Sequence, residues 1–278
     1  MSAGAALLAL ALGGPLLLAL LARREGGVWQ IATPIVFGVL VLLAWQIVCI
    51  GFGVPPILLP APSAVASAIG HNLPMLAADF VQTVLRSVVP GWLIGCGAGL
   101  AAAIALDRSA FLRRGVLPLG SLVSAMPIVG IAPIMVMWFG FDWQSKAAMV
   151  VVMTFFPMLV NATAGLAGTG AMERDLMVSY GASYAQTLFK LRLPNALPFV
   201  FNALKLNSTL ALIGAIVAEF FGTPIVGMGF RISTQVARMN LDVVWAEITL
   251  AAVVGSASFA ALALIERAVM FWHPSFRT

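Results

Sequence analysis

The chain has 278 residues, of which 62% are hydrophobic and only 9% carry a charge. Soluble globular domains consist of about one quarter charged residues, so this composition excludes an ordinary soluble domain and indicates a polytopic membrane domain. The formal net charge of +5 does not indicate nucleic-acid binding, because the Lys and Arg residues stand in small clusters at the ends of apolar stretches. Two cysteines and two histidines are too few to indicate a disulfide framework or a metal site.

Seven apolar stretches are long enough to cross a bilayer, which takes about 20 helical residues. In chain order they are residues 3–22, 29–51, 80–106, 115–140, 147–168, 197–221 and 243–270. The first stretch contains Gly13-Gly14-Pro15 and is either an additional span or a helix that lies in the membrane interface. We therefore predict an N-terminal hydrophobic segment at 1–28 and an all-α transmembrane domain with six core spans at 29–278.

Two polar segments are predicted to lie on the outer side of the membrane. Residues 53–79 are rich in proline, and Ser63 is expected to cap a short amphipathic helix that runs to Gly70. Residues 222–242 form the second outer segment. Together they offer enough helix and polar surface to meet an external partner.

Glycine and proline inside the apolar stretches predict local packing. Gly91, Gly95 and Gly99 recur every four residues, a spacing that favours close contact between helices in lipid. The same glycines resemble part of a nucleotide-binding fingerprint, but they lie in the middle of a span with no strand before them. Residues 115–140 contain three prolines, which predict a kinked span.

The distribution of cations predicts the orientation of the chain. Eleven of the fifteen Lys and Arg residues fall on or next to one side of the membrane, and positively charged loops are typical of the cytoplasmic side. The other four are Arg86, Lys146, Arg231 and Arg238, which lie outside or near the outer edge. This orientation places the large charged loop at residues 171–200 in the cytoplasm.

The 171–200 loop has the pattern of two short helices. The first is expected to run from about Gly170 to Tyr180 and to end at Gly181, because glycine readily adopts the left-handed conformation that follows a helix. Ser183 and Gln186 form a capping box that begins the second helix. Pro194 is expected to end this helix near Arg192, so that the loop forms a rigid knob.

At these residues the chain resembles a family. An acidic residue, then Gly-Ala-Ser, then Leu-Pro is the pattern of the cytoplasmic "EAA" loop of binding-protein-dependent ABC importer permeases. Asp175, Gly181 and Leu193-Pro194 match it, while Leu176 and Met177 replace two alanines. Three further segments resemble the nitrate, sulfonate and taurine branch of that family: Leu59-Pro60-Ala61-Pro62-Ser63, Trp138-Phe139-Gly140 and Phe156-Pro157. The resemblance covers roughly residues 55–272.

The resemblance implies a type I ABC importer fold in a bacterial inner membrane. It also implies two partner ATPase subunits, an external substrate-binding protein and a second permease copy. The residues expected to couple the permease to the ATPase are Asp175, Tyr180, Gly181, Ala182, Ser183, Tyr184, Leu188 and Pro194. Tyr184 and Leu188, one turn apart, are expected to fill a groove on the ATPase; the alternative is that these residues fold the loop onto its own spans.

Polar residues within the spans are candidates for the translocation path. Asn161, Asn207 and Thr209 either line this path or cement helices to one another. Glu219 lies near the outer end of its span, where an ionisable group indicates function. It is expected to act as an outer gate or to contact the external protein; the alternative is a carboxylate that reaches water or pairs with Arg231.

The sequence contains no Gly-x-x-x-x-Gly-Lys-Ser/Thr phosphate loop, so we expect a transport subunit that is not itself an enzyme and needs no cofactor. The cargo class implied by the resemblance is a small anion such as a sulfonate, taurine or nitrate. Residues 227–233 look similar to permeases for heterocycles such as thiamine-precursor pyrimidines or riboflavin. Two other classes stay open: an ion-gradient-driven secondary transporter, and a structural membrane subunit that carries no cargo.

Overall fold

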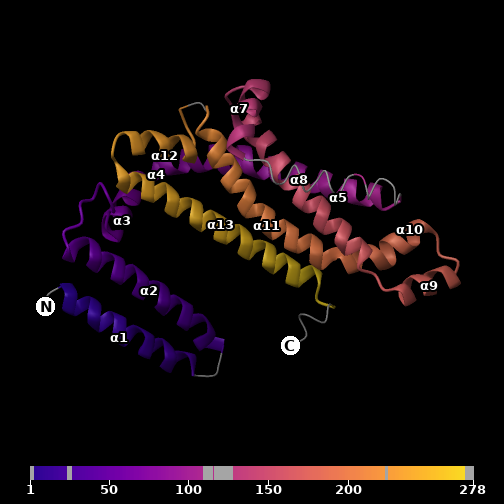
Figure 1. The fold of residues 1–278 in the computed structure, drawn as a ribbon, viewed down its shortest axis with the longest axis horizontal. Coiled ribbons are helices and arrows are strands. Elements are labelled where there is room, and N and C mark those ends of the chain that lie inside the picture. The colour runs from indigo at the N-terminus through magenta and orange to yellow at the C-terminus, as the bar shows by residue number, and fades with distance from the viewer. Residues whose placement is uncertain (1–2, 24–26, 109–114, 116–127, 223–224, 273–278) are drawn as a thin grey trace. The chain divides into compact units, whose positions relative to one another are not determined.

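The computed structural model describes residues 3–23, 27–108, 115, 128–222 and 225–272. Every regular element within these ranges is a helix, which confirms the predicted all-α fold (Figure 1). The chain divides into two compact units, which are described separately. Unit 1 comprises Met1–Leu76 and Ile232–Thr249, and unit 2 comprises Ala77–Arg231 and Leu250–Thr278.

Unit 1 is built on two long apolar helices, α1 (Ala3–Ala22) and α2 (Gly27–Gly51), which pack against each other. The helix α1 continues through Gly13-Gly14-Pro15 without a break. A short helix, α3 (Pro62–His71), packs on α2. The same unit contains the C-terminal part of α12 (Met228–Ala237) and the N-terminal part of α13 (Leu241–Val269).

The helix α3 was predicted correctly, but its predicted cap was wrong. Its N-cap is Ala61, and Pro62 occupies the first helical position, where a missing N–H costs nothing and the fixed φ suits the helix. Ser63 is therefore already inside the helix. Its hydroxyl instead accepts a hydrogen bond from Gln46 Nε2 of α2 at 2.9 Å, and its N–H donates to Gln46 Oε1 at 3.1 Å.

Unit 2 is a helix bundle centred on α8 (Trp143–Ala167), which packs along both α5 (Val89–Asp107) and α11 (Leu193–Glu219) (Figure 1). Before α5 come α4 (Leu73–Phe80) and the π-helical segment η1 (Val81–Val88). The short apolar helix α7 (Ile128–Phe139) packs on α8. Between α8 and α11 the chain forms α9 (Ala171–Ser179), α10 (Tyr184–Thr187) and the π-helical segment η2 (Leu188–Arg192).

Six helices among the described residues are long and apolar enough to cross a membrane. They are Gly4–Ala22, Gly27–Gly51, Leu73–Asp107, Trp143–Ala167, Tyr184–Glu219 and Leu241–Val269. Six of the predicted stretches fall on these helices. Of the predicted span at 115–140, the structure describes Gly115, α7 and Gly140. The predicted kink rested partly on Pro118 and Pro127, which lie outside the described residues.

The prediction that Pro194 ends a helix near Arg192 was wrong. The chain stays helical from Tyr184 to Glu219, and Pro194 lies in the first turn of α11. The reason is the preceding π-helical segment η2, in which the N–H of Leu193 bonds to the carbonyl of Leu188, five residues earlier. This wider turn changes the hydrogen-bond register just before the proline, which lacks an N–H to donate.

Three glycines let α5 and α8 approach closely, as their spacing predicted. A Cβ atom on Gly91 would lie 2.7 Å from the carbonyl oxygen of Ala147, and one on Gly99 would lie 2.5 Å from that of Phe155. At Gly95 the added atom would collide with the Thr154 hydroxyl and with the backbone of Val151. Bare backbone therefore forms this helix–helix contact.

We expect Gly95→Ala to lower the melting temperature of the detergent-solubilised protein, because overpacking a close contact costs about 1–3 kcal/mol. Gly97→Ala is the matched control, since Gly97 is in the same helix and has no atom within 4 Å of an added Cβ. Both changes gain the same helix propensity, about 1 kcal/mol. Equal melting temperatures for the two variants would contradict the proposed close contact.

Candidate functional site

The 171–200 loop begins with α9, which ends in the turn that the sequence predicted. Gly181 has φ +64°, in the left-handed region. Its N–H bonds to the carbonyl of Val178 at 2.9 Å, and the N–H of Ala182 bonds to that of Met177 at 3.0 Å. These two bonds form a Schellman motif, which satisfies the last carbonyls of α9 and fixes the direction of the chain after it.

The capping box at the start of α10 is also confirmed. The N–H of Ser183 donates to Gln186 Oε1 at 2.8 Å, and the N–H of Gln186 donates to the Ser183 hydroxyl at 3.3 Å. A tight C-terminal motif followed at once by an N-terminal box leaves few free dihedrals between α9 and α10. The turn is therefore a rigid connection.

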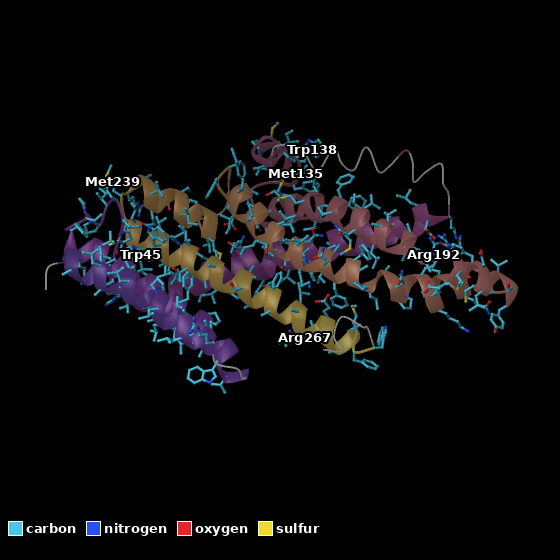
Figure 2. The ribbon with its side chains drawn as sticks, turned by 60° about the horizontal axis from the view of Figure 1, so that its bottom comes forward. Trp45, Met135, Trp138, Arg192, Met239 and Arg267 are labelled. Carbon is cyan, nitrogen blue, oxygen red and sulfur yellow. The ribbon has the colours of Figure 1, made fainter. Side chains whose placement is uncertain are left out.

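A polar hub, formed by Asp107, Leu166 and Arg192, anchors this loop to the bundle. Arg192 (Figure 2) contacts Asp107 through two nitrogens, with Nη1–Oδ2 at 2.5 Å and Nη2–Oδ1 at 2.6 Å. The same guanidinium donates to the backbone carbonyl of Leu166, from Nε at 3.1 Å and Nη2 at 3.0 Å. The hub thus joins the ends of α5 and α8 to the segment that leads into α11.

The hub also fixes two predicted coupling residues, Tyr184 and Leu188. The Tyr184 hydroxyl donates to Asp107 Oδ2 at 3.0 Å, and the guanidinium carbon of Arg108 lies 4.9 Å from the centre of its ring. Leu188 is 5% exposed and belongs to the core between α5, α8 and α11. Both side chains face their own bundle, which supports the alternative that they fold the loop onto its spans.

Several exposed apolar side chains lie earlier in the loop, on α9 and its turn, and Phe189 of η2 is exposed as well. None of the residues of α9 is buried. Met172 is 85% exposed, Val178 76% and Tyr180 80%. Sequence reasoning singled out Tyr180 but missed Met172 and Val178; the available signal was apolar side chains in an otherwise charged loop. Exposed apolar residues on a helix with no buried face are typical of an interaction surface.

We expect Asp107→Asn to destabilise the bundle by about 3 kcal/mol, because it leaves the partly buried Arg192 charge without its counter-ion. Tyr184→Phe is the control, since it removes one hydrogen bond to the same carboxylate and should cost about 1 kcal/mol. Thermal unfolding and the rate of trypsin cleavage at Arg174 measure the effects. A cleavage rate unchanged by Asp107→Asn would contradict an anchoring role for the hub.

A second polar cluster lies at the opposite end of α11, around Glu219. Glu219 is 2% exposed; its Oε1 accepts from the Thr83 hydroxyl at 2.8 Å and its Oε2 from the N–H of Gly229 at 2.7 Å. The Thr83 hydroxyl in turn accepts from the N–H of Met228 at 2.9 Å. Asp79, which is fully buried, accepts from the N–H of Gly227 at 2.6 Å.

The predicted alternative that Glu219 pairs with Arg231 was wrong. Arg231 forms its ion pair with Asp79, with Nε–Oδ2 at 2.8 Å. The reason is the close approach of the turn at 227–229 to the carboxylate: a Cβ on Gly227 would lie 2.7 Å from Glu219 Oε1. The turn backbone, the N–H of Gly229 and the Thr83 hydroxyl therefore occupy the positions around Glu219 that a guanidinium would need.

Thr83→Val is expected to destabilise this cluster by about 1–3 kcal/mol, since it leaves the N–H of Met228 buried without an acceptor. Thr163→Val is the matched control, because Thr163 is also buried but bonds only to the Leu159 carbonyl of its own helix, at 2.7 Å. The two melting temperatures in detergent provide the comparison. A larger loss at Thr163 would contradict the role of Thr83 as a bridge.

The remaining candidate path residues lie in different surroundings. Asn207 is fully buried, and its Nδ2 donates to the Thr154 carbonyl at 2.8 Å and lies 3.2 Å from Cys96 Sγ. Asn161 donates to the Pro157 carbonyl of its own helix at 2.8 Å. Thr209 is exposed. The contacts of Asn207 join α11 to α8 and α5, as expected of a residue that cements helices.

A bundle of membrane-length helices, with a rigid helical projection at one end of α11 and a buried polar cluster at the other, defines a polytopic membrane protein. The chain belongs to the family of binding-protein-dependent transport system inner membrane components, whose sequence profile matches residues 95–271. It is thus a permease-family protein of the inner membrane that spans it several times, as the sequence predicted.

Several proteins of this family are similar to the chain, among them the following three. A formylaminopyrimidine transport permease of Halalkalibacterium halodurans is 29% identical over 88% of this chain and 97% of its own length. A probable ABC transporter permease of Haemophilus influenzae is 32% identical, over 76% of this chain and 85% of the relative. A putative aliphatic sulfonates transport permease of Bacillus subtilis is 28% identical, over 70% and 71%.

Proposed function

We propose that this protein forms the translocation path of an ATP-driven importer, in which two separate ATPase subunits supply the energy and an external binding protein delivers a small solute. A second copy of the chain completes the pore. The observation that carries this proposal is α9, a nine-residue helix with no buried residue and several exposed apolar side chains, fixed to the bundle by a rigid turn. Isolated helices this short are marginal in water, so α9 gains stability from a partner surface.

The proposed docking surface comprises the exposed residues of α9 and its turn, with Met172, Val178 and Tyr180 in the groove of the ATPase and Asp175 at its edge. Gly181, Ala182 and Ser183 set the direction of α9 through their backbone conformation. Tyr184, Leu188 and the residues around Pro194 then pass its motion into α11, because this part of the chain is one continuous helix from Tyr184 to Glu219.

The proposed cycle is alternating access. Closure of the ATPase subunits on ATP draws the two docking surfaces together and opens the path outward, and hydrolysis returns it inward. A difference in binding free energy between the two states at α9 couples the cycle. At the outer end, the cluster of Asp79, Thr83 and Glu219 holds the turn that precedes α12, which we assign to the outer gate.

The proposed cargo is a small sulfonate, taurine-like or nitrate-like anion, or a small heterocycle. Relatives named for aliphatic sulfonates, taurine and nitrate support the first class, and relatives named for formylaminopyrimidine and riboflavin support the second. Asn161 and Thr209 are proposed to line the path. Residues 29–278 form the transport domain, with the segment at 1–28 as an additional span.

The decisive experiment compares two substitutions at one exposed position in the chain coexpressed with its ATPase. Val178→Glu is expected to weaken copurification of the ATPase at least about tenfold, because burying a valine contributes about 1.5–3 kcal/mol and a buried unpaired charge is costly. Val178→Leu keeps the apolar contact and should retain the ATPase. Both variants should match the native melting temperature, since Val178 is 76% exposed.

Uptake into vesicles separates this proposal from the two alternatives. The native complex should take up solute only with ATP, and Val178→Glu should abolish that uptake. Uptake driven by an ion gradient without ATP would show a secondary transporter. Unchanged solute uptake by cells that lack the chain would show a structural subunit.

A further inference from the structure

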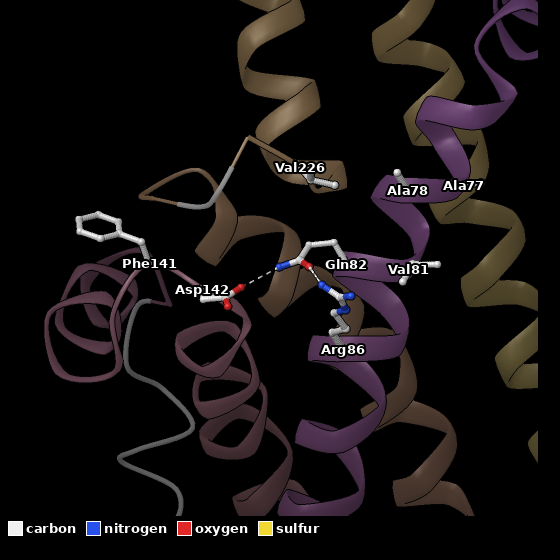
Figure 3. Close-up of a pocket in the computed structure, with 8 residues that line it drawn as sticks. All are labelled: Ala77, Ala78, Val81, Gln82, Arg86, Phe141, Asp142 and Val226. Carbon is white, nitrogen blue, oxygen red and sulfur yellow. Dashed lines mark hydrogen bonds between the residues drawn. The ribbon is translucent and has the colours of Figure 1, made fainter.

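An open cavity of about 870 Å³ lies in unit 2, beside the start of the helix Leu73–Asp107 (Figure 3). Its walls come from three parts of the chain: α4 with η1, the turn before α8, and Val226. The wall residues are mostly apolar, and the polar ones are Gln82, Arg86 and Asp142. This volume is typical of a site for a small molecule, as is an apolar wall with few polar groups.

The cation in this cavity, Arg86, has no counter-ion among the residues that the structure describes: no carboxylate oxygen there lies within 4.0 Å of it. Its side chain is exposed, and its Nη1 donates to the amide oxygen of Gln82 at 3.3 Å (Figure 3). A guanidinium carries five N–H donors, so one long bond to a neutral amide leaves most of them available.

Four other cations of the same unit differ from Arg86, whereas Arg108, Arg174, Lys190 and Arg267 also form no ion pair among the described residues. Arg192, Lys205 and Arg231 each pair with a carboxylate, those of Asp107, Glu266 and Asp79 respectively. Lys146 is almost fully buried and donates to the carbonyls of Phe141 and Gly222. A charged group within a membrane-length helix is costly unless it is paired or hydrated, which indicates a function.

The acid in the cavity wall is already engaged in local structure. Asp142 is the N-cap of α8, where its Oδ1 accepts the N–H of Trp143 at 2.8 Å, and the positive end of the helix dipole favours its charge. The same oxygen accepts from Gln82 Nε2 at 3.3 Å. Gln82 therefore stands between the two opposite charges, with one amide atom bonded to each, and keeps them apart.

We propose that this cavity binds a small solute through an anionic group, with Arg86 as the counter-charge and Gln82 holding the guanidinium in place. The proposal rests on the proposed function, because it makes the bound solute the cargo, and it narrows that cargo to molecules with a sulfonate, carboxylate, phosphate or nitrate group. The predicted orientation places Arg86 near the outer edge of the membrane, where a solute from the external binding protein would arrive first.

The test measures occupancy of the cavity in the full-length chain, reconstituted in phosphatidylcholine bilayers, with Ala78→Cys as the reporter. Ala78 lines the cavity two turns before Arg86, and both native cysteines are buried, so an uncharged methanethiosulfonate should label the new thiol selectively. Ethanesulfonate, nitrate and inorganic phosphate serve as anion probes at constant ionic strength. Ethyl methyl sulfone is the uncharged control for ethanesulfonate.

At least one anion is expected to slow labelling saturably, by about tenfold at about ten times its Kd, while the sulfone has no effect. Adding Arg86→Gln should abolish this protection, and Arg86→Lys should retain part of it. Labelling of Met172→Cys, at the exposed surface of α9, should not respond to any anion. Protection that survives Arg86→Gln, or no protection by any of the three anions, would overturn the proposal.

A second arm distinguishes the cargo from a lipid phosphate. If phosphatidylglycerol added to the bilayer slows labelling in an Arg86-dependent way and soluble anions do not, the cavity is a lipid site and the proposed cargo role is wrong. The assay requires neither ATPase nor uptake. An error in the importer proposal would therefore be detected by the Val178 copurification experiment. An error in the anion-site proposal would be detected by the labelling of Ala78→Cys.

Discussion

The contact between Arg192 and Asp107 is the interaction on which the arrangement of unit 2 most depends. In lipid, helices gain no hydrophobic free energy by associating with each other, so close packing and polar contacts must hold them together. One guanidinium reaches the Asp107 carboxylate at the end of α5 and the Leu166 carbonyl near the end of α8. Because Arg192 lies within the helix that continues into α11, three spans are fixed at the point where α9 leaves the bundle.

Polar contacts also hold the opposite end of α11, but there the donors are backbone N–H groups and a threonine hydroxyl instead of a guanidinium. There the buried carboxylates of Asp79 and Glu219 accept from the backbone N–H groups of Gly227 and Gly229, and Thr83 extends the network to Met228. Polar contacts at both ends and the glycine contact between α5 and α8 leave little freedom within the bundle. A structure of this kind transmits a displacement better than it absorbs one, which favours movement of the bundle as a rigid body.

Local rules account for the predictions that succeeded. The Schellman motif at Gly181 and the capping box at Ser183 each depend on residues within six positions of one another. The failures required knowledge of distant partners. Arg231 pairs with Asp79, 152 residues away in the sequence. The prediction at Pro194 was wrong because it used only the general behaviour of proline in helices. The π-helical turn before Pro194, which lets the helix continue, has no recognisable pattern in the sequence.

Family membership alone does not decide the cargo, because relatives of this chain are named for sulfonates, taurine, nitrate, riboflavin and a formylaminopyrimidine. Gln82 and Arg86 precede the matched region at 95–271, whereas Asp142 and Val226 lie within it. The proposed anion site therefore combines residues from inside the matched region with a charged group that precedes it.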